Sequence, residues 1–176
     1  MKNKNTSIMK MAVKNLTDFL FCSFFGALVV LSFSLFLKDA ALIIVTAIFN
    51  FLLIFAFNFN SIYTDGNHDG GKLEYSGEKA DIFKGVKSFF IVFIIEAVGA
   101  FFFITGILLG NPVIKAVFEI LNIPFLFLLR HFDSNLSASI ICIAVIFLFY
   151  GFVGFISYYL GVKQIDFINK LIYKKK

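Results

Sequence analysis

Four long apolar stretches dominate the pattern of hydrophobic and polar positions along the chain. Each is 19 to 25 residues long, and together they contain one charged residue, Glu96; they cover residues 19–37, 40–59, 89–109 and 138–162. A helix rises about 1.5 Å per residue, so about 20 residues cross the ~30 Å hydrocarbon layer of a bilayer. The stretches lack the two-residue alternation of membrane barrel strands. The pattern therefore predicts an all-α polytopic membrane protein, with four transmembrane helices in a single membrane domain, residues 1–176.

The composition supports this prediction. Hydrophobic residues make up 60% of the 176 residues and charged residues 15%, and the mean hydropathy is +0.91. Soluble domains average about 45–50% apolar and about 25% charged residues. These values exclude an ordinary soluble enzyme, a disordered tail and a secreted disulfide scaffold. The net charge of +5 does not indicate nucleic-acid binding, because the chain offers no soluble basic face. The partner that the composition indicates is the lipid bilayer.

The basic residues predict the orientation in the membrane. Thirteen of the sixteen lie in the N-terminal segment, in the loop 60–88 or in the C-terminal tail, and three lie in the other connections: Lys38, Lys115 and Arg130. Lys and Arg are retained on the cytoplasmic side of a membrane. We therefore expect both termini and the loop 60–88 to be cytoplasmic, in the inner membrane of a bacterium.

Three segments outside the spans carry further expectations. Residues 8–18 have a helical apolar stripe, which indicates a short helix lying on the membrane surface before the first span. The loop 60–88 is rich in Gly, Asn and Asp, which favour turns, and it has too little apolar content for a core. The tail 161–176 repeats a helical pattern and is expected to bend along the membrane.

The external segment 110–137 contains the most structured connection. Asn111-Pro112 is a good helix start, and Lys115, Glu119 and Asn122 then form one polar stripe on an apolar helix before Pro124 ends or kinks it. We expect residues 113–132 to form an interfacial helix, with a shallow re-entrant hairpin and a fifth span as the alternatives. A fifth span would place Lys115 and Glu119 in lipid.

Glu96 is the sharpest point of the sequence, because a carboxylate inside a span is costly and by default marks a functional site. Asn50 lies at a matching depth in the second span, and Gly26 and Gly154 leave room beside it. A hydrogen bond between Glu96 and Asn50 would satisfy both groups structurally. Proton- or cation-coupled transport and contact with a partner subunit are the alternative roles for Glu96.

Six glycines are candidates for close helix packing, because small residues let membrane helices approach. They are Gly26, Gly99, Gly106, Gly110, Gly151 and Gly154.

A weak cation-binding pattern lies in the loop 60–88. Asp65, Asn67 and Asp69 with Gly70 match the first half of an EF-hand loop, but the twelfth position is Ser76 and not glutamate. We expect a solvated, turn-rich loop here. The sequence shows no zinc motif, phosphate loop, dinucleotide fingerprint or catalytic triad, so it predicts no metal, no cofactor and no catalytic residue.

Four short segments carry a resemblance. Residues 63–69 followed by Lys84-Gly85, and the tail segments 159–161 and 171–174, resemble an uncharacterised family of small four-span bacterial integral membrane proteins. The resemblance implies the same topology and no known activity.

The expected function is that of an accessory or interaction subunit of a bacterial cytoplasmic-membrane complex, because four spans leave little room for a substrate path. The alternative is a homo-oligomeric transporter or channel for ions or small solutes, in which Glu96 from each protomer lines a shared path.

Overall fold

The computed structural model describes residues 7–37, 39–76, 81–132 and 135–165, and all regular structure among them is helical. Its long helices are α1 (Ile8–Ser34), α2 (Asp39–Ile54), α3 (Asn60–Ser76), α5 (Phe90–Leu108) and α8 (Leu136–Val162). A π-helical turn, Phe55–Phe59, joins α2 and α3. Four described helical segments are long and apolar enough to cross a membrane: Ile8–Ser34, Ala41–Gly71, Phe90–Leu108 and Leu136–Val162. The predicted all-helical, four-span fold is confirmed.

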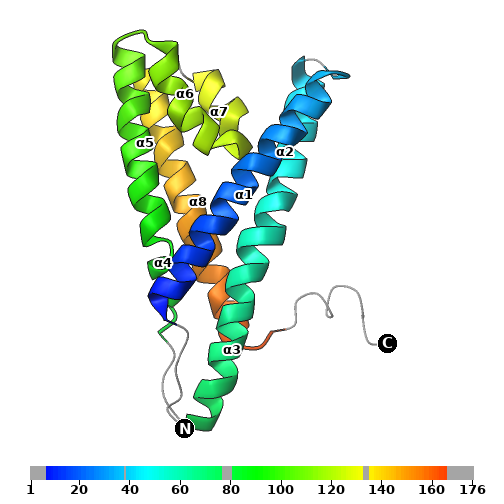
Figure 1. Cartoon of the computed structure of the whole chain (residues 1–176), viewed down its shortest axis with the longest axis vertical. Coiled ribbons are helices and arrows are strands. Elements are labelled where there is room, and N and C mark those ends of the chain that lie inside the picture. The colour runs from blue at the N-terminus through cyan, green and yellow to red at the C-terminus, as the bar shows by residue number, and fades with distance from the viewer. Residues whose placement is uncertain (1–6, 38, 77–80, 133–134, 166–176) are drawn as a thin grey trace.

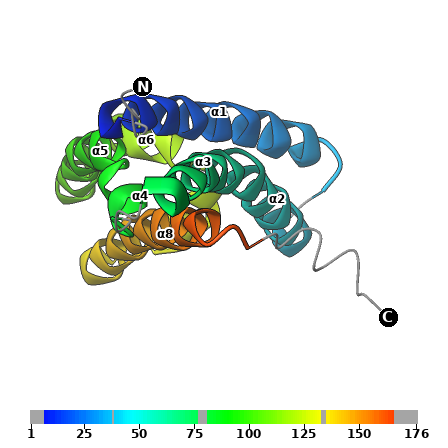
Figure 2. The same cartoon turned by 90° about the horizontal axis from the view of Figure 1, so that it is seen from below.

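The long helices form a bundle whose two ends are built differently. At one end, the start of α1 lies beside α3, the short helix α4 (Lys84–Lys87) and the end of α8 (Figure 1). At the other end, α6 (Pro112–Leu121) and α7 (Leu126–Phe132) lie between α5 and α8 on one side and α1 and α2 on the other. Seen along the bundle, α3 and α4 lie between α1 and α8 (Figure 2).

The second span continues well beyond the predicted boundary at residue 59. Residues 60–76 form α3 and not the turn-rich loop that their Gly, Asn and Asp content predicted. The physical reason is tertiary packing against α8. A Cβ atom added to Gly66 would lie 2.6 Å from the carbonyl oxygen of Tyr158, and one added to Gly161 would collide with the carbonyl oxygen of Tyr63. Such close backbone contact compensates the poor helix propensity of this stretch.

The first span also begins earlier than predicted. α1 runs without a break from Ile8, so residues 8–18 form no separate surface helix. Met11, Ala12 and Asn15 are buried inside the bundle, which explains the apolar stripe of this segment. At the other end of the chain, α8 ends at Val162. Most of the tail for which a membrane-lying helix was expected, residues 166–176, lies outside the described residues.

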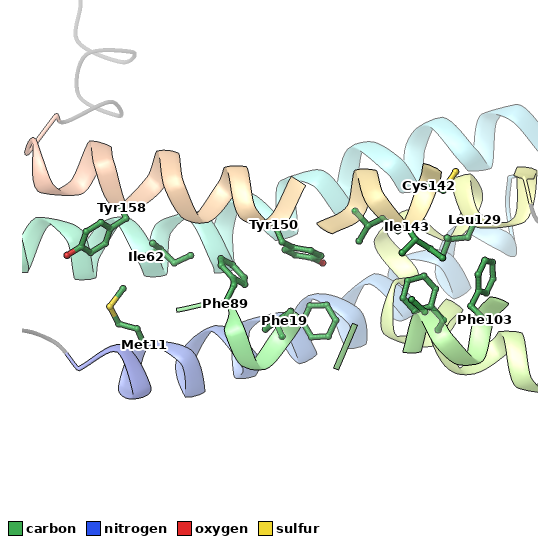
Figure 3. Packing of buried hydrophobic residues seen from close by; sticks show 14 residues of the cluster. Met11, Phe19, Ile62, Phe89, Phe103, Leu129, Cys142, Ile143, Tyr150 and Tyr158 are labelled. Atoms are coloured by element: carbon green, nitrogen blue, oxygen red, sulfur yellow. The ribbon is translucent and has the colours of Figure 1, made fainter. Parts of the chain in front are cut away.

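Aromatic side chains fill the centre of the bundle. Tyr150 of α8 contacts Phe19 of α1 and Phe89 beside α5, with ring centroids 5.6 and 5.8 Å apart (Figure 3). Phe103 of α5 contacts Phe118 of α6 at 5.3 Å. These five side chains are fully buried. The aromatic core therefore fixes α6 against α5, and it fixes α1 against α8.

Candidate functional site

The connection between α5 and α8 folds as a re-entrant hairpin. The side chain of Asn111 accepts hydrogen bonds from the backbone N–H groups of Val113 (3.0 Å) and Ile114 (3.3 Å), so it caps α6 as the sequence predicted. α6 ends at Leu121, and the segment Ile123–Phe132 leaves it at an angle of 105°. α5 ends and α8 begins at the same end of the bundle (Figure 1). The chain therefore turns back between them, and does not lie along the interface as the favoured interpretation had it.

The tip of this hairpin reaches the middle of the bundle. The hydroxyl of Ser23 donates a hydrogen bond to the carbonyl oxygen of Leu121 (2.5 Å). A Cβ atom added to Gly26 would lie 3.2 Å from the Cγ2 atom of Ile123. Pro124 is buried at the turn. These contacts attach the tip to α1 at the depth of Gly26.

The tip also carries the partner of the buried carboxyl. Glu96 of α5 is completely buried, and the amide Nδ2 of Asn122 donates a hydrogen bond to its Oε2 atom at 2.8 Å. The pairing of Glu96 with Asn50 expected from the sequence is not formed. The Oδ1 atom of Asn50 lies instead over Gly26, 3.0 Å from where a Cβ atom would be. Asn122 was visible in the sequence as the third residue of the polar stripe, but its depth was not.

Three polar atoms at this site are buried without a hydrogen-bond partner among the described residues: Glu96 Oε1, Asn122 Oδ1 and Tyr150 Oη. An ionised carboxylate and an amide oxygen only accept hydrogen bonds, whereas a protonated carboxyl also donates one. The Nδ2–Oε2 bond is the one hydrogen bond between the carboxyl and the amide among the described residues, so the site combines one satisfied pair of polar atoms with three unsatisfied ones.

A second polar contact closes the hairpin on itself. The Nε atom of Arg130 in α7 donates to the Oε2 atom of Glu119 in α6 at 3.2 Å. The side chain of Glu119 is 12% exposed and that of Arg130 is 66% exposed. The first residue of the predicted stripe, Lys115, packs its stem on Gly106, where an added Cβ atom would lie 2.7 Å from the Cγ atom of Lys115. The stripe therefore faces the bundle and the other arm of the hairpin.

The opposite end of the bundle holds an ion-pair cluster that the sequence did not reveal. Asp69 of α3 is buried, pairs with the ammonium of Lys84, and accepts a hydrogen bond from the hydroxyl of Tyr158 at 2.9 Å. Lys14 of α1 pairs with Asp65 at 3.1 Å. These contacts tie α1, α4 and α8 to α3.

This cluster replaces the weak cation-loop pattern. Asp65, Asn67 and Asp69 belong to one continuous helix, so they cannot wrap around an ion as the first half of an EF-hand loop does. Lys14 and Lys84 neutralise the two carboxylates, and Asn67 is exposed. Within the described ranges, no three His, Cys, Asp or Glu side chains are grouped so that they could hold a metal ion.

The structure separates the six candidate glycines into two groups. An added Cβ atom would lie within about 3 Å of a neighbour at four of them: 3.0 Å from Asn50 at Gly26, 2.9 Å from Phe118 at Gly99, 2.7 Å from Lys115 at Gly106 and 2.9 Å from Phe89 at Gly154. Gly110 instead has a φ of +62° and open space around it, so it serves the turn after α5. Gly151 is 3.9 Å from Phe93, which is ordinary contact.

Four closely packed glycines were missed: Gly66, Gly70, Gly85 and Gly161. The spacing of Gly66 and Gly70 is the Gly-x-x-x-Gly pattern of close membrane helices, but it has this meaning only once residues 60–76 are known to be helical. The hairpin that carries Asn122 packs instead on Gly26 and Gly99, where added Cβ atoms would meet Ile123 and Phe118. No family model, curated protein or solved structure matches this chain.

Proposed function

We propose that this chain is an accessory or interaction subunit of a complex in the bacterial cytoplasmic membrane, in which the buried carboxyl holds the re-entrant hairpin in place. The observation that carries the proposal is the enclosure of Glu96. Its side chain is completely buried within its own bundle, and its hydrogen-bond donor, Asn122, comes from the same chain. A carboxyl in this position stabilises the protomer and does not face a path shared between protomers.

The other charged groups of the hairpin support the same proposal. Glu119 is paired with Arg130 inside the hairpin, so the protomer uses its own polar groups to hold its fold. Its outer surface is apolar, with large exposed side chains along the spans, among them Phe101, Leu148 and Phe152. Such a surface suits contact with lipid and with the helices of another membrane protein.

The proposed orientation places both termini and the α3–α4 connection in the cytoplasm. Five basic residues with described positions lie at the end of the bundle where α1 begins and α8 ends: Lys10, Lys14, Lys84, Lys87 and Lys163. Arg130 and Lys115 lie on the hairpin at the other end. This asymmetry is the one that the positive-inside rule associates with a cytoplasmic end.

The test is chemical crosslinking in native membranes, followed by purification in mild detergent and determination of the mass of the complex. We expect a reproducible complex with a second membrane protein, and we expect Glu96→Gln to retain it, because glutamine can still accept a hydrogen bond from Asn122. A homo-oligomer without any second protein would contradict the accessory role.

A proton- or cation-coupled transporter is the second candidate, and the three buried polar atoms without partners favour it. Glu96 Oε1, Asn122 Oδ1 and Tyr150 Oη form a place where a proton could be taken up and released if the hairpin moved. The sequence predicts a shared path lined by Glu96 from each protomer of a homo-oligomer; because Glu96 is enclosed within its own bundle, the path proposed here lies within one protomer, beside the hairpin. Glu96→Gln would then abolish flux into vesicles while leaving assembly intact. If the chain is an accessory subunit, the same variant should assemble and behave much like the wild type.

A further inference from the structure

Two apolar grooves beside the hairpin meet at Arg130. The first has a volume of about 320 Å³ and lies between α2 and the α7 arm. The second has a volume of about 490 Å³ and lies between α1 and the α6 arm. Both are lined by Val30, Ile123, Leu126 and Arg130. The two grooves adjoin at these residues. The second also contains the carboxylate of Glu119, the ion-pair partner of Arg130, and most of the other lining side chains of both grooves are apolar.

The guanidinium of Arg130 has unused donors. Its Nε atom bonds Glu119, and the remaining N–H groups of its five donors have no partner in the part of the chain that the structure describes. Glu119 is tucked into the hairpin with 12% of its side chain exposed, whereas Arg130 is 66% exposed. The guanidinium therefore keeps donors beyond Nε for a ligand, and His131 lines the first groove together with Arg130.

A buried amide lies deeper in the same groove. Asn50 is 2% exposed and lines the first groove, and its Oδ1 atom has no hydrogen-bond partner among the described residues. The groove thus presents a cation near its rim, an amide further in, and apolar walls. A phospholipid offers groups in the same order: a phosphate for the guanidinium, glycerol esters whose carbonyl oxygens can accept from the amide Nδ2 atom of Asn50, and acyl chains for the apolar walls. The Oδ1 atom of Asn50 has no part in this match, because it and the ester oxygens only accept.

We propose that this groove binds one anionic phospholipid of the bilayer, with its phosphate on Arg130, its ester region beside Asn50 and an acyl chain along Val30 and Ile123. The donors of Arg130 select this occupant, because Glu119 engages only the Nε atom of the guanidinium. Arginine binds phosphate oxygens through two parallel N–H bonds, and an anionic headgroup adds no second cation that would repel the guanidinium. The proposal does not depend on the role of the protein as an accessory subunit or a transporter.

Native mass spectrometry of the full-length protein in mixed micelles tests the proposal. The micelles contain either phosphatidylglycerol or phosphatidylcholine, and the retained lipid is counted per chain. We expect one retained phosphatidylglycerol and a clear preference over phosphatidylcholine. Arg130→Gln should lower this retention by about tenfold, which corresponds to about 1.4 kcal/mol. Arg130→Lys, which keeps the charge but not the planar fork, should retain an intermediate amount.

Lys10→Gln is the matched control, because it also removes one charge from an exposed position, but at the other end of the bundle. Val30→Phe fills both grooves without changing charge, so it should also reduce retention, and thermal unfolding shows whether each variant is folded. Equal losses in Lys10→Gln and Arg130→Gln would mean diffuse charge attraction and overturn the site. Three other results would also overturn the site: equal retention of both lipids, displacement of the lipid by inorganic phosphate, or a second copy of the chain in place of lipid.

Discussion

The amide Nδ2 atom of Asn122 donates a hydrogen bond to the carboxyl of Glu96 at 2.8 Å in the centre of the bundle. Glu96 belongs to α5, whereas Asn122 lies at the turn of the re-entrant hairpin that follows α5. Both side chains are completely buried. The bond joins the turn of the re-entrant hairpin to the middle of α5, so the hairpin cannot withdraw without exposing the carboxyl to an apolar environment.

Asn122→Leu should destabilise the protein, because it removes the donor and leaves Glu96 buried without a partner. We expect a loss of about 1–3 kcal/mol in the free energy of unfolding, measured by denaturant titration in mixed micelles. Glu96→Gln should cost less, because two amides can still pair. Asn60→Ala is the control, since Asn60 is exposed. An unchanged stability in Asn122→Leu would mean that the hairpin is held by apolar packing alone.

Two glycines of α8 should respond oppositely to alanine. A Cβ atom at Gly161 would collide with the backbone of α3, at the carbonyl of Tyr63 and 2.8 Å from the backbone nitrogen of Asn67, whereas one at Gly151 has ordinary contacts. Gly161→Ala should therefore destabilise the protein by about 1–3 kcal/mol through overpacking. Gly151→Ala should be neutral or stabilising by up to about 1 kcal/mol through helix propensity. Thermal unfolding of both variants in the same detergent measures the difference, and similar melting temperatures would contradict the close α3–α8 contact.

The spans could be predicted from the sequence because hydropathy is a property of long windows, which tertiary contacts do not change. The region around residues 60–76 could not, because its Gly, Asn and Asp content favours turns as long as the segment is considered alone. Gly66 and Gly70 become helix-compatible when α8 packs against them. The decisive information lies in the partner helix, almost a hundred residues away in the sequence.

The candidate site was predicted in part. Glu96 was identified by the cost of its charge, and the stripe of Lys115, Glu119 and Asn122 was identified by its spacing. The hydrogen bond between Asn122 and Glu96 was not predicted, because the depth of Asn122 in the bundle depends on how sharply the chain bends at Pro124. Only the folded hairpin, bent by 105°, brings the end of the stripe to the carboxyl. Likewise, Lys84 was counted among the basic residues of a loop, and its pairing with the buried Asp69 depends on α3 being a helix.

The orientation can be measured with single cysteines on the two ends of the bundle. Ser137 in the first turn of α8 and Lys163 just beyond its last turn are both exposed, and both native cysteines are buried. In intact cells, we expect Ser137→Cys to react with a membrane-impermeant maleimide. Lys163→Cys should react only after the membrane is opened. The reverse labelling pattern would overturn the orientation proposed from the basic residues.

Asp81 should titrate below its usual range. A hydrogen bond from Lys87 (2.7 Å) is the main cause that lowers the pKa of the Asp81 carboxyl, and a bond from the backbone N–H of Phe83 lowers it further. Because the folded pKa lies below the value of about 3.9 in an unfolded chain, the pair stabilises the protein at neutral pH. This contribution is lost as the pH falls below about 4 and through the folded pKa. NMR titration of the carboxyl in micelles should show the pKa of Asp81 rising in Lys87→Ala; an unchanged value would show that the pair does not form.

Lys84 and Lys87 lie one turn apart on α4 and should differ sharply when they are replaced. Lys84 pairs with Asp69, whose side chain is 1% exposed. Lys87 pairs with Asp81, and the side chains of this second pair are each about half exposed. Removing one partner of a buried pair leaves an uncompensated charge, so Lys84→Met should cost about 3–5 kcal/mol of stability. An exposed pair contributes less than about 1 kcal/mol, so Lys87→Met should change stability little.

The double variant Lys84→Met/Asp69→Leu separates the charge effect from a packing effect. With both charges removed, no buried ion is left unpaired, so most of the loss in Lys84→Met should be recovered. Tyr158 then loses its acceptor, which leaves a smaller residual cost. Denaturant titration of the three variants in one detergent gives the coupling energy between the two residues. If the double variant were as unstable as the sum of the single ones, Asp69 and Lys84 would act independently, and the ion pair would not be what holds α4 against α3.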